Sequence, residues 1–285
     1  MKRIVVTGAT GFIGNSLVEK LIERGYDVIP VGRSLKKWSS DFIKKNLIKI
    51  DLTESTLPDF KDVDCVCILS SVQPNKKNNW HKYYDLNSKQ IFHFLNKNFC
   101  QLIYISSTTV NSTNGITNPL NYYGVSKALA EKILNINKEH FKQCSILRFP
   151  SVMGVNHYGG IINDLKEWIE KNEEILLFDE GKKVRNILHV DDAVSSILQT
   201  IELRNILSQY EVFEVGSKDS ISLRKISELL IKMMGKENKI LLSKKSTNSK
   251  NIIVDNSYSI SKLEYKPRSI KVGIKKYLKD CGYEI

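Results

Sequence analysis

The chain opens with residues 1–14, MKRIVVTGATGFIG, and this stretch decides the fold. Its apolar run at residues 4–6 is typical of a strand that is buried on both faces of a parallel sheet. Glycines follow at a spacing of three residues, and the apolar pattern of a helix begins directly behind them. A strand, a glycine turn and a helix start together form a phosphate-binding site, because the helix start offers free N–H groups and the positive end of its dipole.

The glycine turn predicts a dinucleotide site rather than a plain tight turn. Gly8 allows the tight turn, Gly11 lets the main chain approach a pyrophosphate, and Gly14 lets the helix pack close to the strand. The spacing G-x-x-G-x-x-G differs from the G-x-G-x-x-G of ordinary dehydrogenases. Its position directly behind a buried strand favours cofactor binding. The residues that we expect to contact the cofactor here are Thr7, Gly8, Gly11, Phe12, Ile13 and Gly14.

Length and composition suit a globular α/β protein. The chain has 285 residues, 41% of them hydrophobic, which is enough for a large core. It has no apolar run long enough to cross a bilayer and no signal peptide, so we expect a cytoplasmic protein. The net charge of +12 comes from scattered lysines without a basic stripe, so we expect neither nucleic acid nor a membrane as a partner. The five cysteines lack metal-ligand spacing, and we expect buried thiols and no metal.

Strand and helix patterns alternate along the first 150 residues. After the opening strand, we expect strands at 27–31, 47–50, 63–69, 102–105 and 145–149, and helices at 80–96 and 121–141. This alternation predicts an α/β fold with a doubly wound parallel Rossmann sheet. We therefore expect residues 1–150 to form a dinucleotide-binding domain.

The pattern becomes less regular after Pro150. We expect strands at 175–178, 184–190 and 210–215, and helices at 161–171, from 191 onward and at 223–234. Residues 151–285 are expected to form a smaller α/β substrate-binding region over the carboxyl ends of the strands, where ligands of such folds bind. Parts of this region can cross back to the sheet.

The end of the second expected strand bears on the choice of cofactor. An NAD site usually has an acidic residue here that accepts a hydrogen bond from the ribose 2′-hydroxyl, whereas an arginine can receive a 2′-phosphate. The chain has Arg33 and no acidic neighbour, which favours NADP(H), with NAD(H) or an Arg that only faces water as alternatives. The third strand ends at Asp51 and Leu52, where such folds contact the adenine.

Tyr123 and Lys127 are candidates for acid–base chemistry. A spacing of four residues places them on one face of a helix. A free tyrosine titrates near pH 10, and a nearby ammonium would lower that pKa toward the range that an acid–base catalyst needs. Such a pair is often only two surface neighbours. The glycine turn upstream and the serines at the end of the fifth strand favour the catalytic interpretation.

Several motifs in order resemble those of one family, the extended short-chain dehydrogenases/reductases. This is the NAD-dependent epimerase/dehydratase family, which acts on nucleotide sugars and includes 4-epimerases, 4,6-dehydratases and 4-ketoreductases. The resemblance covers nearly the whole chain. It rests on the segments TGATGFIG, DLNSKQ, ISSTTV, YGVSK, ILRFPSVMG, VRNILHVDDAV and VGSKDSISL.

The resemblance implies a role for each matching residue. Tyr123 would exchange a proton with a sugar oxygen, Ser107 would hydrogen-bond that oxygen, and Lys127 would hold the nicotinamide ribose and lower the pKa of Tyr123. Arg185 would grip the diphosphate of a nucleoside-diphosphate sugar, a bidentate task that suits a guanidinium. Ser151 stands where the family usually has an asparagine that contacts the substrate. Further cofactor contacts are expected at Leu69, Ser70, Asn87, Pro150 and Val152.

Departures from the family pattern narrow the expected reaction. The 4,6-dehydratases carry Asp-Glu where this chain has Thr108 and Thr109, which argues against dehydration. The short connection between Ser107 and Tyr123 resembles that of the 4-ketoreductases. We therefore expect reduction of a 4-keto nucleotide sugar, with an NAD-dependent 4-epimerase as the alternative and a non-catalytic dinucleotide-binding regulator as a more distant one. A homodimer through helix 121–141 and its neighbour is also expected.

Overall fold

The computed structural model describes residues 2–55, 57–74, 79–95, 99–111, 119, 121–157, 159–247 and 249–285. Its centre is a parallel sheet of seven strands in the order β11-β6-β5-β4-β1-β2-β3. The chain reverses its direction of winding between β1 and β4, which confirms the predicted doubly wound sheet. The strands are β1 (Arg3–Thr7), β2 (Asp27–Gly32), β3 (Ile48–Lys49), β4 (Cys65–Ile68), β5 (Gln101–Ser107), β6 (Gln143–Phe149) and β11 (Tyr210–Glu214).

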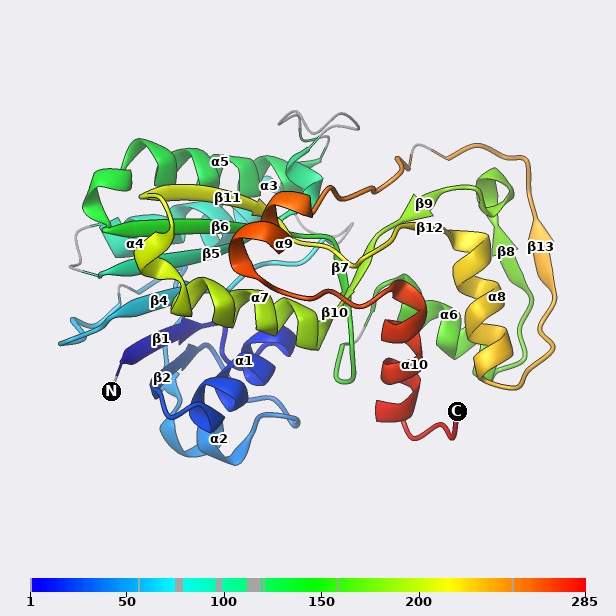
Figure 1. Cartoon of the computed structure of the whole chain (residues 1–285), viewed down its shortest axis with the longest axis horizontal. Helices are drawn as coiled ribbons and strands as arrows, with labels where there is room; N and C mark the ends of the chain where they lie inside the picture. The colour runs from blue at the N-terminus through cyan, green and yellow to red at the C-terminus, as the bar shows by residue number, and fades with distance from the viewer. Residues whose placement is uncertain are drawn as a thin grey trace.

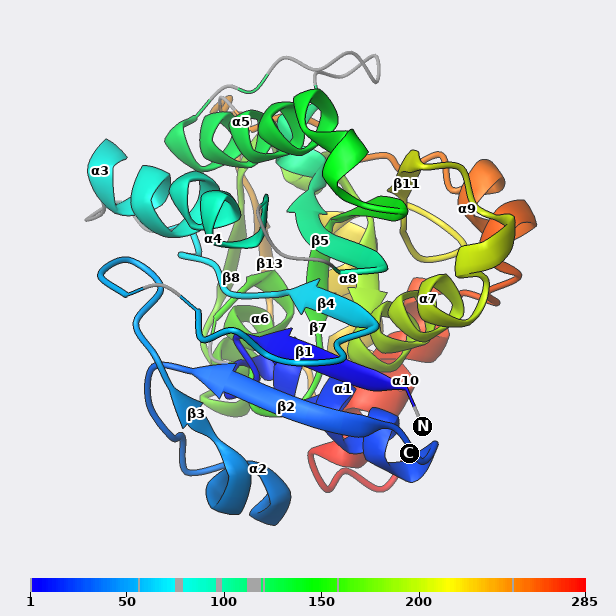
Figure 2. The same ribbon diagram turned by 90° about the vertical axis from the view of Figure 1, so that its left-hand side faces the viewer.

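Helices cover both faces of this sheet, as Figures 1 and 2 show. One face packs against α1 (Phe12–Glu23), α2 (Asp41–Asn46), α7 (Val190–Glu202) and the end of α9 (Ser257–Leu263). The other face packs against α4 (Phe92–Leu95) and α5 (Tyr122–Ile136), with α3 (Trp80–Tyr83) beside them. Apolar side chains fill both interfaces because every strand of a parallel sheet is buried on two sides.

A smaller lobe stands at the carboxyl edge of the sheet, on the right in Figure 1. It has its own apolar core, shared by α6 (Ile161–Glu170), α8 (Leu223–Met233) and α10 (Ile270–Asp280). Its strands form three pairs: β7 (Ser151–Met153) with β10 (Ile187–His189), β9 (Val184–Arg185) with β12 (Ile221–Ser222), and β8 (Ile175–Leu177) with β13 (Ile240–Leu242). Strand β11 and helix α7 also follow Pro150, but they pack with the central sheet.

Three predicted elements are wrong in their extent. The helix predicted at 80–96 is interrupted by a π-helical turn over residues 84–88, and its last residue, Asn96, lies outside the described residues. The helix predicted at 121–141 ends at Ile136, where the Asn137 side chain donates a hydrogen bond to the carbonyl oxygen of Ile133 (2.8 Å). The strand predicted at 184–190 divides at Asn186, whose side chain bonds to the segment 217–220.

The sequence interpretation also missed α2, α9 and α10, although the buried residues of α10 follow a helical spacing: Ile270, Ile274, Tyr277 and Leu278. Among the described residues, no helix is long and apolar enough to cross a membrane.

Candidate active site

The glycine turn contains close main-chain contacts at Gly8 and Gly14, as predicted for a tight turn that packs against a helix. Gly8 has φ +68°, and a Cβ built on it would lie 2.7 Å from the main-chain nitrogen of Ser70. A Cβ on Gly14 would lie only 2.1 Å from the carbonyl oxygen of Gly8. The Gly11 N–H donates to that same oxygen (2.8 Å) and closes the turn. Only glycine can therefore occupy positions 8 and 14 without a shift of the main chain.

The start of α1 suits a phosphate group. Its cap residue, Gly11, makes no side-chain capping bond, and the first turn contains no acidic residue. Phe12, the first residue of α1, stacks on His157, with ring centroids 4.8 Å apart. A turn with three glycines at an uncapped helix start fits the pyrophosphate of a dinucleotide.

The ends of β1 and β4 are joined by hydroxyl groups next to this turn. The Thr7 and Ser70 hydroxyls lie 2.9 Å apart, and Ser70 donates to the Gln90 side chain (2.5 Å). Leu69 is half-buried beside Ser70. These bonds hold the first two strand ends of the predicted cofactor site in a fixed relation.

Arg33 lies at the end of β2, where the adenosine ribose is expected. Its side chain is 72% exposed, and its Nη1 lies 3.7 Å from Oδ2 of Asp51, which follows β3. Asp51 accepts hydrogen bonds from the main chain and the hydroxyl of Thr53, and these bonds and Arg33 hold its pKa below the usual range against the effect of burial. The structure thus brings the predicted Arg33 and Asp51 together, while Leu52 is buried in the core.

Tyr123 and Ser107 meet at the carboxyl end of β5. Tyr123 lies in the first turn of α5, which Asn121 caps by accepting a hydrogen bond from Gly124 N–H (2.8 Å). The hydroxyls of Ser107 and Ser71 lie near the Tyr123 phenol and lower its pKa. The Ser107 hydroxyl also accepts from the Thr109 hydroxyl (3.0 Å). A carbonyl oxygen placed against Tyr123 would therefore meet two hydroxyl groups from two strand ends.

The expected lowering of the Tyr123 pKa is wrong for this structure. Burial raises the pKa of Tyr123 to about 12, and the nearby hydroxyls of Ser107 and Ser71 offset this only in part. The Lys127 ammonium lies 6.0 Å from the centre of the Tyr123 ring and donates instead to the carbonyl oxygen of Ile105 (2.8 Å). Loss of water around the phenol outweighs the distant charge.

Lys127 is itself strongly affected by its surroundings. Its side chain is buried, and its ammonium lies over the ring of Tyr104, 4.6 Å from the centroid. Burial lowers the pKa of Lys127 to about 7, although the charge of Glu131 acts in the opposite direction. A lysine whose charge can change near neutral pH is characteristic of functional sites.

Asn87 holds the elements around Tyr123 together. Its side chain is fully buried, accepts from the Val72 N–H (2.8 Å) and the Ser71 hydroxyl (3.0 Å), and donates to the Ser126 hydroxyl (3.0 Å). These bonds place Asn87 between the end of β4 and helix α5, which carries Tyr123 and Lys127. Sequence reasoning missed Ser71, whose signal was its place directly behind Ser70 at a strand end.

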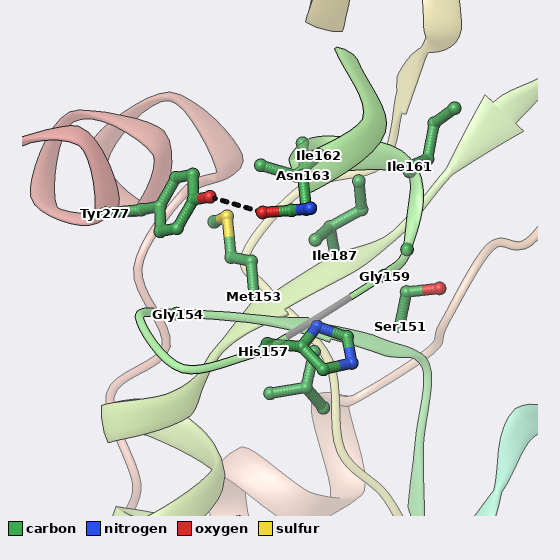
Figure 3. A pocket seen from close by; sticks show the side chains of 12 residues that line it. Ser151, Met153, Gly154, His157, Gly159, Ile161, Ile162, Asn163, Ile187 and Tyr277 are labelled. Atoms are coloured by element: carbon green, nitrogen blue, oxygen red, sulfur yellow. Dashed lines mark hydrogen bonds between the residues drawn. The ribbon is translucent and has the colours of Figure 1, made fainter. Parts of the chain in front are cut away.

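The predicted substrate residues lie in the lobe. Ser151 is exposed at the start of β7, and Arg185 in β9 donates to the carbonyl oxygens of Val184 and Lys250 (both 2.8 Å). Figure 3 shows the shallow pocket beside Ser151, where Tyr277 and Asn163 hydrogen-bond (3.3 Å). Between sheet and lobe, Pro150 is buried and Val152 packs against the core.

The parallel sheet, the open glycine turn and the buried Ser107–Tyr123–Lys127 cluster define a Rossmann-fold protein of the short-chain dehydrogenase/reductase class. The model of the "NAD dependent epimerase/dehydratase family" matches residues 4–216. The chain therefore belongs to this family of nucleotide-sugar enzymes, as the motifs predicted.

Relatives in this family include epimerases and reductases. A UDP-glucuronate 4-epimerase of Thermodesulfobacterium geofontis is 25% identical over 269 residues, which cover 82% of this chain and 81% of that protein. A dTDP-4-dehydro-6-deoxy-D-allose reductase of Streptomyces bikiniensis is 21% identical over 311 residues, 96% of this chain and 94% of that protein. The solved UDP-glucuronic acid 4-epimerase of Bacillus cereus, in complex with UDP-glucuronic acid and NAD, has a TM-score of 0.83 and 22% identity, and the match covers 98% of this chain and 99% of that one.

Proposed function

We propose that this protein is an NADP(H)-dependent oxidoreductase that reduces the 4-keto group of a nucleoside-diphosphate sugar. The observation that carries the proposal is the placement of Ser107, Tyr123 and Lys127 at the same edge of the sheet as the glycine turn. Residues 151–285 supply most of the sugar-binding side, with Ser151 and Arg185 as substrate contacts. The short connection from Ser107 to Tyr123 and the absence of Asp-Glu after Ser107 favour reduction over dehydration.

The dinucleotide, when bound, supplies or accepts the hydride at C4 of its nicotinamide. The chain would hold it through the glycine turn, the start of α1 and the strand ends that carry Ser70, Asp51 and Arg33. Arg33 would bind the 2′-phosphate with a charge-assisted hydrogen bond. Lys127 would bind the ribose hydroxyls after giving up its bond to the Ile105 carbonyl.

Tyr123 acts as the general acid in this proposal. As the sugar carbonyl becomes an alkoxide, the Tyr123 phenol gives its proton to that oxygen and Ser107 donates a hydrogen bond to it. A pKa of about 12 keeps the phenol protonated at neutral pH, as a proton donor must be. A charged Lys127 then stabilises the phenolate that remains.

A 4-epimerase that keeps NAD bound is the second candidate. The exposed Arg33 pairs with Asp51, so an NAD ribose could be accommodated beside it, and the Bacillus cereus epimerase is described with NAD. The two candidates differ in what the purified protein carries. The test is to denature the protein, identify any released dinucleotide by mass, and titrate the emptied protein with NADPH and NADH.

An empty site that binds NADPH more tightly than NADH supports the reductase. Tightly bound NAD(H) that survives purification supports the epimerase. Dinucleotide binding without turnover of any nucleotide sugar would indicate a regulator, and no binding of either dinucleotide would contradict all of these functions.

We further propose a homodimer through α5 and its neighbour. Helix α5 has solvent-exposed apolar side chains, since Tyr122 is 60% exposed and Ile136 is 63% exposed. Phe92 of the neighbouring α4 is 52% exposed. Burial of such side chains is favourable. Sedimentation of the wild type and of Ile136→Glu tests this, since the charged variant should be monomeric.

A further inference from the structure

A buried charged cluster joins four elements behind the candidate active site. The Arg148 guanidinium of β6 donates to both carboxylate oxygens of Glu131 (3.0 and 2.6 Å), to Glu214 (3.1 Å) and to the Asn111 side-chain oxygen (2.9 Å). Asn111 in turn donates to Glu214 (2.5 Å). The side chains of Arg148 and Glu131 are only 11% and 7% exposed. We call these four residues the arginine clasp.

The clasp is attached on both sides of Ser107. Directly before it, the Ser106 hydroxyl donates to Glu131 (2.5 Å). Directly after it, the short turn Thr108–Val110 ends at Asn111, which the clasp binds through both ends of its amide. Ser107 therefore lies between two points that are fixed to the same guanidinium and carboxylates.

The clasp is also attached to the helix that carries the other two candidate catalytic residues. Glu131 follows Lys127 by one helical turn and Tyr123 by two turns on α5. The fork of Arg148 holds Glu131 with two parallel bonds, a geometry that fixes orientation as well as distance. One cluster thus determines where the Ser107 turn lies relative to the Tyr123 helix.

We propose that Asn111 and Arg148 are positioning residues, which hold the Ser107 hydroxyl beside the Tyr123 phenol and so align both hydroxyls on the sugar oxygen. This inference rests on the proposed function. Neither residue takes part in the chemistry, because Arg148 is held by two carboxylates and Asn111 has no titratable group.

Asn111 is the better residue for a test, because removal of Arg148 would leave the carboxylates of Glu131 and Glu214 without the positive charge that pairs with them. Asn111→Ala removes two hydrogen bonds and no charge. The matched control is Asn137→Ala, which makes the same chemical change at the far end of α5, where the Asn137 side chain donates to the carbonyl oxygen of Ile133. If Asn111→Ala does not fold, Arg148→Lys keeps the charge but loses the fork and serves in its place.

The measurement is kcat and KM for a 4-keto nucleotide sugar, with the NADPH dissociation constant and a crystal structure of each variant. We expect kcat of Asn111→Ala to fall about 100-fold, as for a misplacement of about 1 Å. KM, NADPH affinity and the Asn137→Ala control should stay within about twofold of the wild type. An unchanged kcat in Asn111→Ala would overturn the inference.

The crystal structures separate this inference from the proposed function. If the wild type reduces no 4-keto sugar, the proposed function fails, and the distance between the Ser107 and Tyr123 hydroxyl oxygens alone decides the role of the clasp. A longer distance in Asn111→Ala, with the wild-type distance kept in Asn137→Ala, supports the positioning role. The wild-type distance in both variants contradicts it.

Discussion

The glycine turn and the Ser107–Tyr123–Lys127 cluster lie at the same edge of one sheet. The turn is built from main-chain atoms, whereas the cluster is built from side chains. In the turn, the main chain forms the site, and an added Cβ at Gly14 would lie 2.1 Å from a carbonyl oxygen. In the cluster, buried side chains form the site, and loss of water alters the pKa of two of them. We therefore expect the turn to lose cofactor affinity when a substitution adds an atom to it. We expect the cluster to lose activity when a substitution removes a hydroxyl group or a charge.

The largest expected effect is the loss of turnover when Tyr123 of the cluster is replaced. Tyr123→Phe keeps the ring but removes the proton donor, and general acid catalysis contributes about 100- to 10,000-fold. We expect kcat to fall by that factor while the dissociation constant of NADPH changes less than about twofold. Stopped-flow measurement of NADPH oxidation gives both values. Tyr122→Phe, at the exposed neighbour, is the control, and a Tyr123→Phe enzyme with normal turnover would remove Tyr123 from the mechanism.

Adding one methyl group to the turn is the opposite experiment. Gly14→Ala forces the main chain at Gly8 to move, and we expect NADPH affinity to fall about 100-fold, since overpacking costs about 1–3 kcal/mol. Gly25→Ala is the control, because it adds the same methyl group at a glycine that has no atom within 4 Å of an added Cβ. Isothermal titration with NADPH compares the two variants. Equal losses in both would mean that the close contact at Gly14 does not govern the turn.

A smaller loss of cofactor affinity is expected at Arg33, at the end of β2, where we expect the adenosine ribose to bind. Arg33→Ala removes a mostly exposed guanidinium, so we expect NADPH affinity to fall about tenfold, and NADH affinity to change little. Fluorescence titration with both dinucleotides measures the ratio. Arg24→Ala, which breaks an ion pair with Glu202 at the other end of α1, should change neither affinity. The same loss for NADH as for NADPH would contradict recognition of the 2′-phosphate by Arg33.

The last prediction concerns stability instead of binding or turnover: Lys127 should make the free energy of unfolding depend on pH. The folded pKa is about 7 and the unfolded one is near 10.5, so between these values the unfolded chain binds a proton that the folded chain has lost. This group therefore raises the free energy of unfolding as pH increases from 7 to 10.5, by up to about 1.4 kcal/mol per pH unit. Urea unfolding of the wild type and of Lys127→Met at pH 7, 8 and 9 measures the difference. Parallel pH curves for the two proteins would place the Lys127 pKa outside this range.

The same contrast explains how much the sequence could predict. The strands of the sheet and the glycine turn follow from local patterns, because apolar runs and glycine spacing are properties of neighbouring residues. The interruption of the helix around Asn87 does not follow from local patterns, because the Asn87 side chain hydrogen-bonds to Ser126, which is 39 positions away in the chain. The predicted direction of the Tyr123 pKa shift is wrong for a related reason, since the burial that raises this pKa is a property of the whole fold.

The residues of the arginine clasp differ in how readily sequence reasoning could have found them. Glu131 has a local signal, because it follows Lys127 by four residues on one helix. Glu214 has none, because it reaches Arg148 only through the pairing of β11 with β6, 66 positions apart in the chain. Parallel pairing between distant strands is what brings these charges together.

The most direct test of the central proposal follows a labelled hydride. The wild type is incubated with a 4-keto nucleotide sugar and NADPH carrying deuterium at C4 of the nicotinamide, and the sugar product is analysed by mass spectrometry and NMR. We predict one deuterium at C4 of a reduced sugar, with its formation abolished in Tyr123→Phe. A sugar that is returned without deuterium, or a Tyr123→Phe enzyme that transfers the label as fast as the wild type, would contradict the account.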